Sequence, residues 1–164
     1  MMTSGVVFIH SAPAALCPHI EWAVSSALGR PLRFGWTPQE VETSSYRAEV
    51  TWSGAVGTST RLVSTLQRFP QLRFEVTEEP TTANEGLRFA YTPDLGLFHA
   101  QTSPAGDLVV GENELRQALR QARHDSSRLV VELSRLLGEA WDDELEPFRM
   151  AGETEPVRWL RQVV

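Results

Sequence analysis

Hydrophobic and polar positions in the first half of the chain switch between the period of a strand and that of a helix. Residues 5–11 (GVVFIHS) form a mostly apolar run of strand-forming residues, which predicts a central strand covered on both faces. Apolar residues then recur at helical spacing between Pro18 and Gly29, which predicts a helix with a proline at its first position and a glycine after its last. Its expected buried stripe is Ile20, Ala23, Val24, Ala27 and Leu28.

Strict alternation returns in residues 31–36 and 45–52, which predict two strands joined by a polar loop. Residues 58–69 predict a second helix that stops at Pro70, and residues 71–78 predict another alternating strand. The resulting order is βαββαβ, the split arrangement of ferredoxin-like folds.

The second half predicts further strands and two helices. Residues 87–93 alternate like a strand, and residues 96–102 and 107–110 flank a Ser-Pro-Ala-Gly turn, which is typical of a hairpin. Helical spacing runs from about Glu112 to His124 and from Ser127 to about Trp141, before an acidic stretch and a short apolar end, residues 157–164. The expected inner faces are Leu115, Ala118, Leu119 and Ala122 on the first helix, and Leu129, Val130, Leu133, Leu136, Leu137 and Ala140 on the second.

These elements predict an α+β fold in a single domain, residues 1–164. Its ferredoxin-like βαββαβ first half, residues 1–79, is extended by a β-strand, a β-hairpin and two C-terminal helices within residues 87–164. The composition agrees with a folded globular protein, because 41% of the residues are hydrophobic and 22% are charged.

The charge distribution disfavours nucleic acid as a partner. The net charge is −6, whereas binding to backbone phosphates requires a surplus of cations on at least one face. Residues 139–155 contain seven carboxylates and one arginine, so this acidic segment carries the whole net charge. All cations of the chain are arginines.

Neither a membrane nor an oxidising compartment is indicated. No apolar run approaches the ~20 residues that a membrane helix needs, and the N-terminus lacks the basic region of a secretion signal. The single cysteine, Cys17, cannot form an internal disulfide, which is typical of a reducing compartment. We therefore expect a cytoplasmic protein.

Cys17 is the one candidate nucleophile. At the N-cap of the predicted helix it would feel the positive end of the helix dipole, and His10 or His19 could act as its base. However, Pro18 removes the nearest backbone N–H that could hold an oxyanion, and cysteine commonly packs as a small buried hydrophobe. We interpret Cys17 as structural, with Cys17-dependent acyl transfer or hydrolysis as the alternative.

The sequence does not predict a metal or a cofactor. His10, Cys17, His19 and Glu21 are suitable ligand types, but their spacing matches no zinc-finger arrangement. The segment GAVGTST, residues 54–60, lacks the lysine of a phosphate-binding loop and the three glycines of a dinucleotide-binding turn.

Two charged surfaces are candidate partner-binding sites. Arg116, Arg120 and Arg123 form a basic stripe on one predicted helix. The acidic segment offers Asp142, Asp143, Glu144 and Glu146, which either pair with arginines inside the molecule or face a partner. A third charged set occupies the polar positions of the strands and is expected to form cross-strand pairs: Arg33, Arg47, Glu49, Arg73, Glu75 and Arg88.

Several stretches give the chain a resemblance to a known family. HSAPAALCPHIEWAVSSALG (10–29), LRFEVT (72–77), YTPDLGLFHA (91–100) and LLGEAWDDELEPFRMAGETEPVRWLRQVV (136–164) resemble a family of actinobacterial proteins known as a domain of unknown function. The resemblance implies a gene that, as is often the case in that family, lies beside fatty-acid synthesis genes, including those for acyl carrier protein and ketoacyl synthase. The resemblance implies an accessory role there, with acyl carrier protein or another fatty-acid synthesis component as the partner, and it carries over no catalytic residues.

The sequence thus favours a non-catalytic interaction or accessory protein, a subunit or regulator. Two alternatives from other classes remain open. One is the Cys17-dependent enzyme, and the other is a small-molecule sensor that uses the sheet face and the hairpin.

Overall fold

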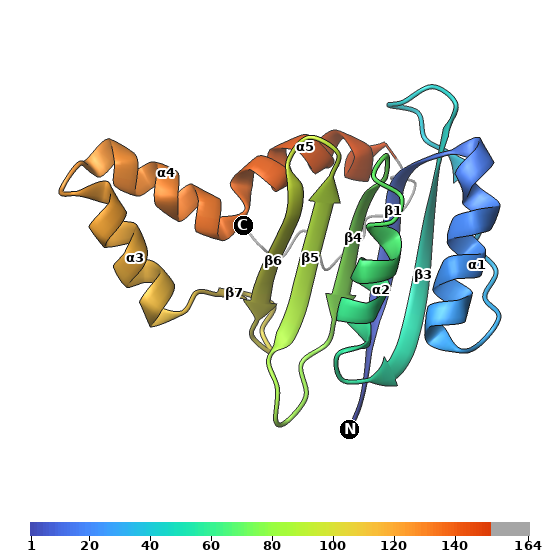
Figure 1. Cartoon of the computed structure of the whole chain (residues 1–164), viewed down its shortest axis with the longest axis horizontal. Coiled ribbons are helices and arrows are strands. Elements are labelled where there is room, and N and C mark those ends of the chain that lie inside the picture. Colours follow the sequence, from blue (N-terminus) through green and yellow to red (C-terminus); the bar gives the residue numbers. More distant parts are fainter. Residues whose placement is uncertain (152–164) are drawn as a thin grey trace.

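The computed structural model describes residues 1–151, which form a seven-stranded antiparallel sheet and five α-helices (Figure 1). The strand order in the sheet is β2-β3-β1-β4-β5-β6-β7. The strands are Met2–Pro13 (β1), Thr37–Pro38 (β2), Ser45–Ala55 (β3), Arg73–Glu78 (β4), Gly86–Thr92 (β5), Gly96–Thr102 (β6) and Leu108–Val109 (β7). The helices are Cys17–Leu28 (α1), Thr58–Leu66 (α2), Glu112–Ala122 (α3), Ser126–Leu137 (α4) and Glu139–Met150 (α5), and a 3-10 turn, Ala14–Leu16 (η1), precedes α1.

The first half has the element order that the sequence predicts. Its strands lie in the order β4-β1-β3-β2, neighbouring strands are antiparallel, and α1 and α2 connect them. This arrangement is consistent with a ferredoxin-like start, and the α+β class is confirmed.

Side chains at alternate strand positions separate the two faces of the sheet. On one face, Val7 and Ile9 of β1 and Phe74 of β4 pack with Ile20 of α1 and Leu62 of α2, and none of the five is more than 1% exposed. The opposite face carries polar side chains of β1, β4 and β5, and α5 covers it (Figure 1). The amphipathic pattern thus places one apolar core between the sheet and the first two helices.

Two local predictions in this half are wrong. The expected strand at 31–36 does not form, because the N–H groups of Leu32 and Phe34 donate to side chains of α1 and not to a neighbouring strand. Cys17 is the first residue of α1 and not its N-cap, because η1 already turns the chain and Leu16 takes the capping position.

The second half extends the sheet beyond β4. β5 pairs with β4 and β6, and the N–H of Gly106 donates to the carbonyl of Ser103 in the predicted hairpin turn between β6 and β7. After β7, α3 and α4 form a helical hairpin that projects away from the sheet (Figure 1). We call this hairpin, residues 112–137, the helical arm.

The expected second C-terminal helix, Ser127 to about Trp141, is in fact two helices. Gly138 lies in the left-handed conformation with φ 73°, which ends α4 and lets α5 start in a new direction. A Cβ at this position would come within 2.7 Å of the Phe98 ring, so the sharp turn and the close packing both require glycine. The acidic segment thus becomes the helix α5, while its residues 153 and 155 and the apolar end at 157–164 lie outside the described residues.

The expected burial of the arm is also wrong in large part. Ala118 and Ala122 of α3 are buried as predicted, but Leu119 is 58% exposed and Val130 is 62% exposed. All residues of α4 are described, and none of them is buried. The helical spacing is as predicted, but within residues 1–151 the contact between α3 and α4 covers only part of their apolar faces.

Candidate interaction surface

The helical arm is stabilised by contacts between its two helices and by hydrogen bonds that cap the N-terminus of each helix. Its two helices are in contact, and the buried residues of α3 are the small Ala118 and Ala122. The Glu114 carboxylate accepts a hydrogen bond from the N–H of Gly111 at 3.0 Å, and Asp125 accepts from the N–H groups of Ser127 and Arg128 at the start of α4. These contacts define the hairpin but leave most of its large apolar side chains uncovered.

Exposed apolar side chains follow one another along α4. Val130, Leu133 and Leu137 are spaced i, i+3, i+7, so they lie on one face of the helix. Their exposed fractions are 62%, 36% and 41%. We call these three residues the apolar ridge. A row of this kind on a protruding element marks an interaction site more often than a scattered exposed residue does.

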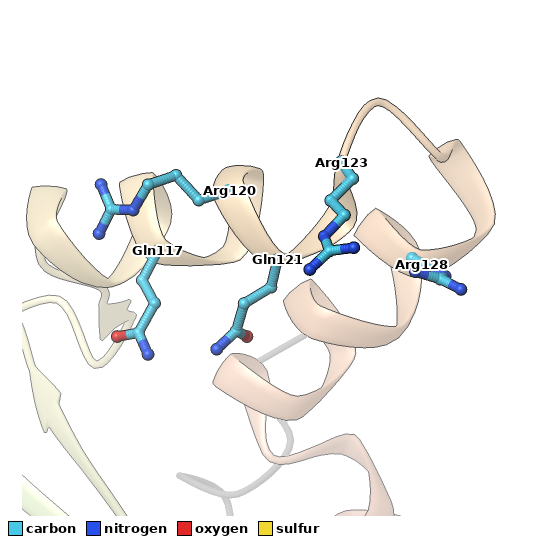
Figure 2. A pocket seen from close by; sticks show the side chains of 5 residues that line it. All are labelled: Gln117, Arg120, Gln121, Arg123 and Arg128. Carbon is cyan, nitrogen blue, oxygen red and sulfur yellow. The ribbon is translucent and has the colours of Figure 1, made fainter.

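Arginines lie on the same arm, around an open hollow of about 580 Å³ (Figure 2). Arg128 pairs weakly with Asp125 at 3.6 Å, and Arg116, outside the hollow, pairs with Glu112 at 2.6 Å. Neither Arg120 nor Arg123 has an ion pair or side-chain hydrogen bond within residues 1–151. The hollow is lined by Gln117, Arg120, Gln121, Arg123 and Arg128.

Two non-glycine residues in the turn of the arm adopt the left-handed conformation. Arg123 has φ 49° and His124 has φ 66°. Each such residue costs on the order of 1 kcal/mol. The tight turn brings the Arg123 side chain to the hollow beside Arg128 (Figure 2).

The acidic helix α5 divides its carboxylates between the interior and the solvent. Asp142 pairs with Arg88 at 2.5 Å and with Arg149 at 2.9 Å. Glu144 pairs with Arg73 at 3.4 Å and accepts a hydrogen bond from Thr92 at 2.9 Å. Asp143 is exposed, and Glu146 is exposed and lies 3.5 Å from Arg149. Two of the four candidate acids therefore fasten α5 to the sheet.

A buried charge network forms beneath α5, with Glu75 at its centre. This side chain is 1% exposed. Its two oxygens accept hydrogen bonds from Nε2 of His10 at 2.8 Å, from Arg88 at 3.1 Å and from Arg149 at 2.5 and 3.0 Å. Among the residues that were expected to form cross-strand pairs, Arg88 and Glu75 do form an ion pair. Glu49 is exposed.

The network shifts the pKa values of Glu75 and Arg149 in opposite directions. Burial alone would raise the pKa of Glu75, but the hydrogen bond from His10 and the charges of Arg149 and Arg88 outweigh burial and lower it well below the usual range. Burial likewise works against the charge of Arg149, and Glu75 and Asp142 overcome it and raise its pKa. Both oxygens of Glu75 accept hydrogen bonds, so this one carboxylate holds side chains of β1, β5 and α5 together. We call Glu75 with His10, Arg88 and Arg149 the clamp.

Cys17 lies in surroundings that suit packing. The residue is 7% exposed, its Sγ is 3.5 Å from the carbonyl oxygen of Pro13, and burial raises the pKa of its thiol. His10 is engaged with Glu75, and His19 is exposed. Within residues 1–151 no imidazole is hydrogen-bonded to this thiol, and no three histidine, cysteine, aspartate or glutamate side chains are placed to hold one metal ion.

Sequence reasoning missed the clamp and the apolar ridge. The clamp was detectable only in part, since Glu75 alternates with Phe74 and Val76 as a solvent-facing residue would. The ridge has the pattern of any core-facing helix, so its exposure depends on what the rest of the chain covers.

Comparisons with known proteins place the chain in a group without an assigned activity. A family model described as a protein of unknown function, DUF3145, matches residues 6–162. No curated protein and no solved structure matches the chain. None of the helices within residues 1–151 has the length and apolar character needed to cross a membrane.

Proposed function

The chain belongs to the DUF3145 family of unknown function, and we propose that it is a non-catalytic interaction protein that binds an acidic partner through its helical arm. The observation that carries the proposal is the exposure of the arm, which projects from the sheet (Figure 1). The arm carries the exposed apolar ridge on α4 and the arginines that line the hollow. A subunit or regulator of this kind acts in the cytoplasm by docking.

The ridge supplies the affinity. Covering the exposed parts of Val130, Leu133 and Leu137 would remove apolar surface from water, and fully burying such a side chain contributes about 1.5–3 kcal/mol. Because these side chains are already partly covered, about 1 kcal/mol each is the appropriate scale.

The arginines supply the selectivity for an acidic partner. Arg120 and Arg123 have no ion-pair partner within the described chain, and the exposed pair of Arg116 with Glu112 is of the weak surface type. An acidic helix laid along the arm would therefore gain new charge pairs without breaking strong ones. The family resemblance motivates a more specific proposal. In it the partner is acyl carrier protein, and this chain has an accessory role in fatty-acid synthesis.

The test is a binding isotherm with acyl carrier protein and a double charge reversal, Arg120→Glu with Arg123→Glu. We expect the double variant to lose about tenfold or more in affinity. The matched control is Arg30→Glu with Arg68→Glu, which changes the net charge equally at exposed positions away from the arm. Undiminished binding by the arm variant, or an equal loss in the control, would contradict the proposal.

A further inference from the structure

A second surface, remote from the arm in sequence, lies between α1 and the segment 30–36. It is an open groove of about 550 Å³. Its walls include the indoles of two tryptophans and the rings of two prolines, one of each from α1 and one of each from the segment. The residues that matter most are Cys17, Pro18, Trp22, Leu32, Arg33 and Trp36.

The groove is preformed, because α1 holds the segment in place. The hydroxyl of Ser25 accepts a hydrogen bond from the N–H of Leu32 at 3.0 Å, and the Glu21 carboxylate accepts one from the N–H of Phe34 at 3.1 Å. Phe34 is 7% exposed and packs against Trp36 with ring centroids 5.3 Å apart. These contacts replace the strand ladder that the sequence predicted for this segment.

The groove offers aromatic surface that the fold itself does not use. Trp22 is 74% exposed, the largest exposed fraction among the large hydrophobic residues of the described chain. Tryptophan and arginine are the residue types that dominate the binding energy of interfaces. An indole left in water beside Pro18, Leu32 and Trp36 therefore indicates a binding surface.

Arg33 is the cation of the groove, and it has no ion pair among the described residues, although the Glu21 carboxylate also lines the groove and keeps its charge. One oxygen of the Glu21 carboxylate is engaged by the Phe34 N–H, whereas Arg33 is exposed and has no ion pair or side-chain hydrogen bond within residues 1–151. An occupant that carries a carboxylate beside an apolar or cyclic side chain would satisfy both features of the groove.

We propose that this groove binds an extended, proline-containing peptide segment of a partner protein, with an acidic residue placed at Arg33. Segments in the polyproline II conformation dock on aromatic-lined grooves because their rigid backbone loses little entropy on binding. The groove is too open to bury most of a small ligand, as a small-molecule site does. An extended peptide needs only one covered side.

The test is a selection from a random-peptide phage library on the intact protein. We expect enriched sequences that combine proline with aspartate or glutamate, and a loss of about tenfold or more in the affinity of the matching synthetic peptides for Trp22→Ala. Arg33→Glu should weaken the same peptides and favour basic ones. Because Cys17 is the only cysteine and lines the groove, bound peptide should slow the reaction of its thiol with Ellman's reagent.

Trp22 is mostly exposed, so Trp22→Ala should keep the fold, which circular dichroism and the melting temperature verify. Arg120→Glu with Arg123→Glu serves as the control for independence, because it should leave peptide binding unchanged even if the arm has no acidic partner. Failure to enrich any sequence, enrichment without proline or acid, or equal binding by Trp22→Ala would overturn the proposal.

Discussion

At the scale of single residues, the position of Glu75 shows how far alternation can be trusted. The strand pattern puts it opposite Phe74 and Val76, and the structure agrees. The pattern alone does not show whether that second face meets water or another element. Here Arg149 of α5 covers it, 74 residues further along the chain, so the burial of Glu75 depends on a contact that local periodicity does not contain.

Glu75→Gln should destabilise the fold by about 3 kcal/mol, because it leaves Arg88 and Arg149 buried without their main counter-charge. Urea unfolding at neutral pH measures the change. Glu49→Gln, on the exposed side of β3, is the control and should shift stability by less than about 0.5 kcal/mol. Equal effects of the two substitutions would contradict the clamp.

The same residue predicts the direction of the pH dependence. Because folding lowers the pKa of Glu75, its contribution to stability is complete above the unfolded pKa of about 4.3 and is lost as the pH falls toward the folded value. The stability gap between wild type and Glu75→Gln should therefore narrow below about pH 4. A gap that widens with acidification would contradict this assignment.

His124→Gly should stabilise the protein by about 0.5–1 kcal/mol, because glycine relieves the left-handed strain at the turn of the arm, offset in part by its greater freedom in the unfolded chain. Thermal unfolding measures the gain. His19→Gly, at an exposed position in the first turn of α1, should instead lose about 0.3–0.5 kcal/mol, the difference between the helix propensities of histidine and glycine.

At the scale of elements, the periodicity of apolar residues predicted most helices and strands. It failed where a side chain from another element binds or packs against the segment. Segment 31–36 alternates like a strand, but Ser25 and Glu21 bind its N–H groups. The predicted helix at 127–141 runs through Gly138, because the local sequence does not show that the ring of Phe98, on β6, packs against this position and requires a glycine there. Element type is thus a local property, whereas these interruptions are tertiary ones.

α2 provides a test of such a tertiary bond, because no side chain of its own caps its N-terminus. The buried carboxylate of Glu78, on β4, accepts hydrogen bonds from the N–H groups of Gly57 at 2.8 Å and Ser59 at 2.9 Å. Glu78→Gln should cost about 1–2 kcal/mol in denaturant unfolding, since it removes the charge at the helix N-terminus. The neighbouring exposed Glu79→Gln should have little effect, and equal losses would contradict the capping role.

At the scale of the whole molecule, the α+β class followed from the sequence but the exposed arm did not. The spacing of Val130, Leu133 and Leu137 is that of a helix facing a core, and the arginine stripe was visible as well. Only the structure shows that the helices that carry the ridge and the arginines form one element that projects from the sheet (Figure 1), and that the ridge stays exposed on it. An interaction surface depends on which side chains the rest of the chain leaves uncovered. Local sequence patterns therefore do not predict it.

Amide hydrogen exchange of the intact protein, with and without acyl carrier protein, tests the role of the arm most directly. We predict that the partner slows amide exchange in α3 and α4, while β1 and β4 exchange as before. None of the residues of α4 is buried in the free protein, so a partner that covers this helix should change its exchange rates. Protection confined to other elements, or unchanged exchange throughout the arm at saturating partner, would contradict the arm as the docking surface.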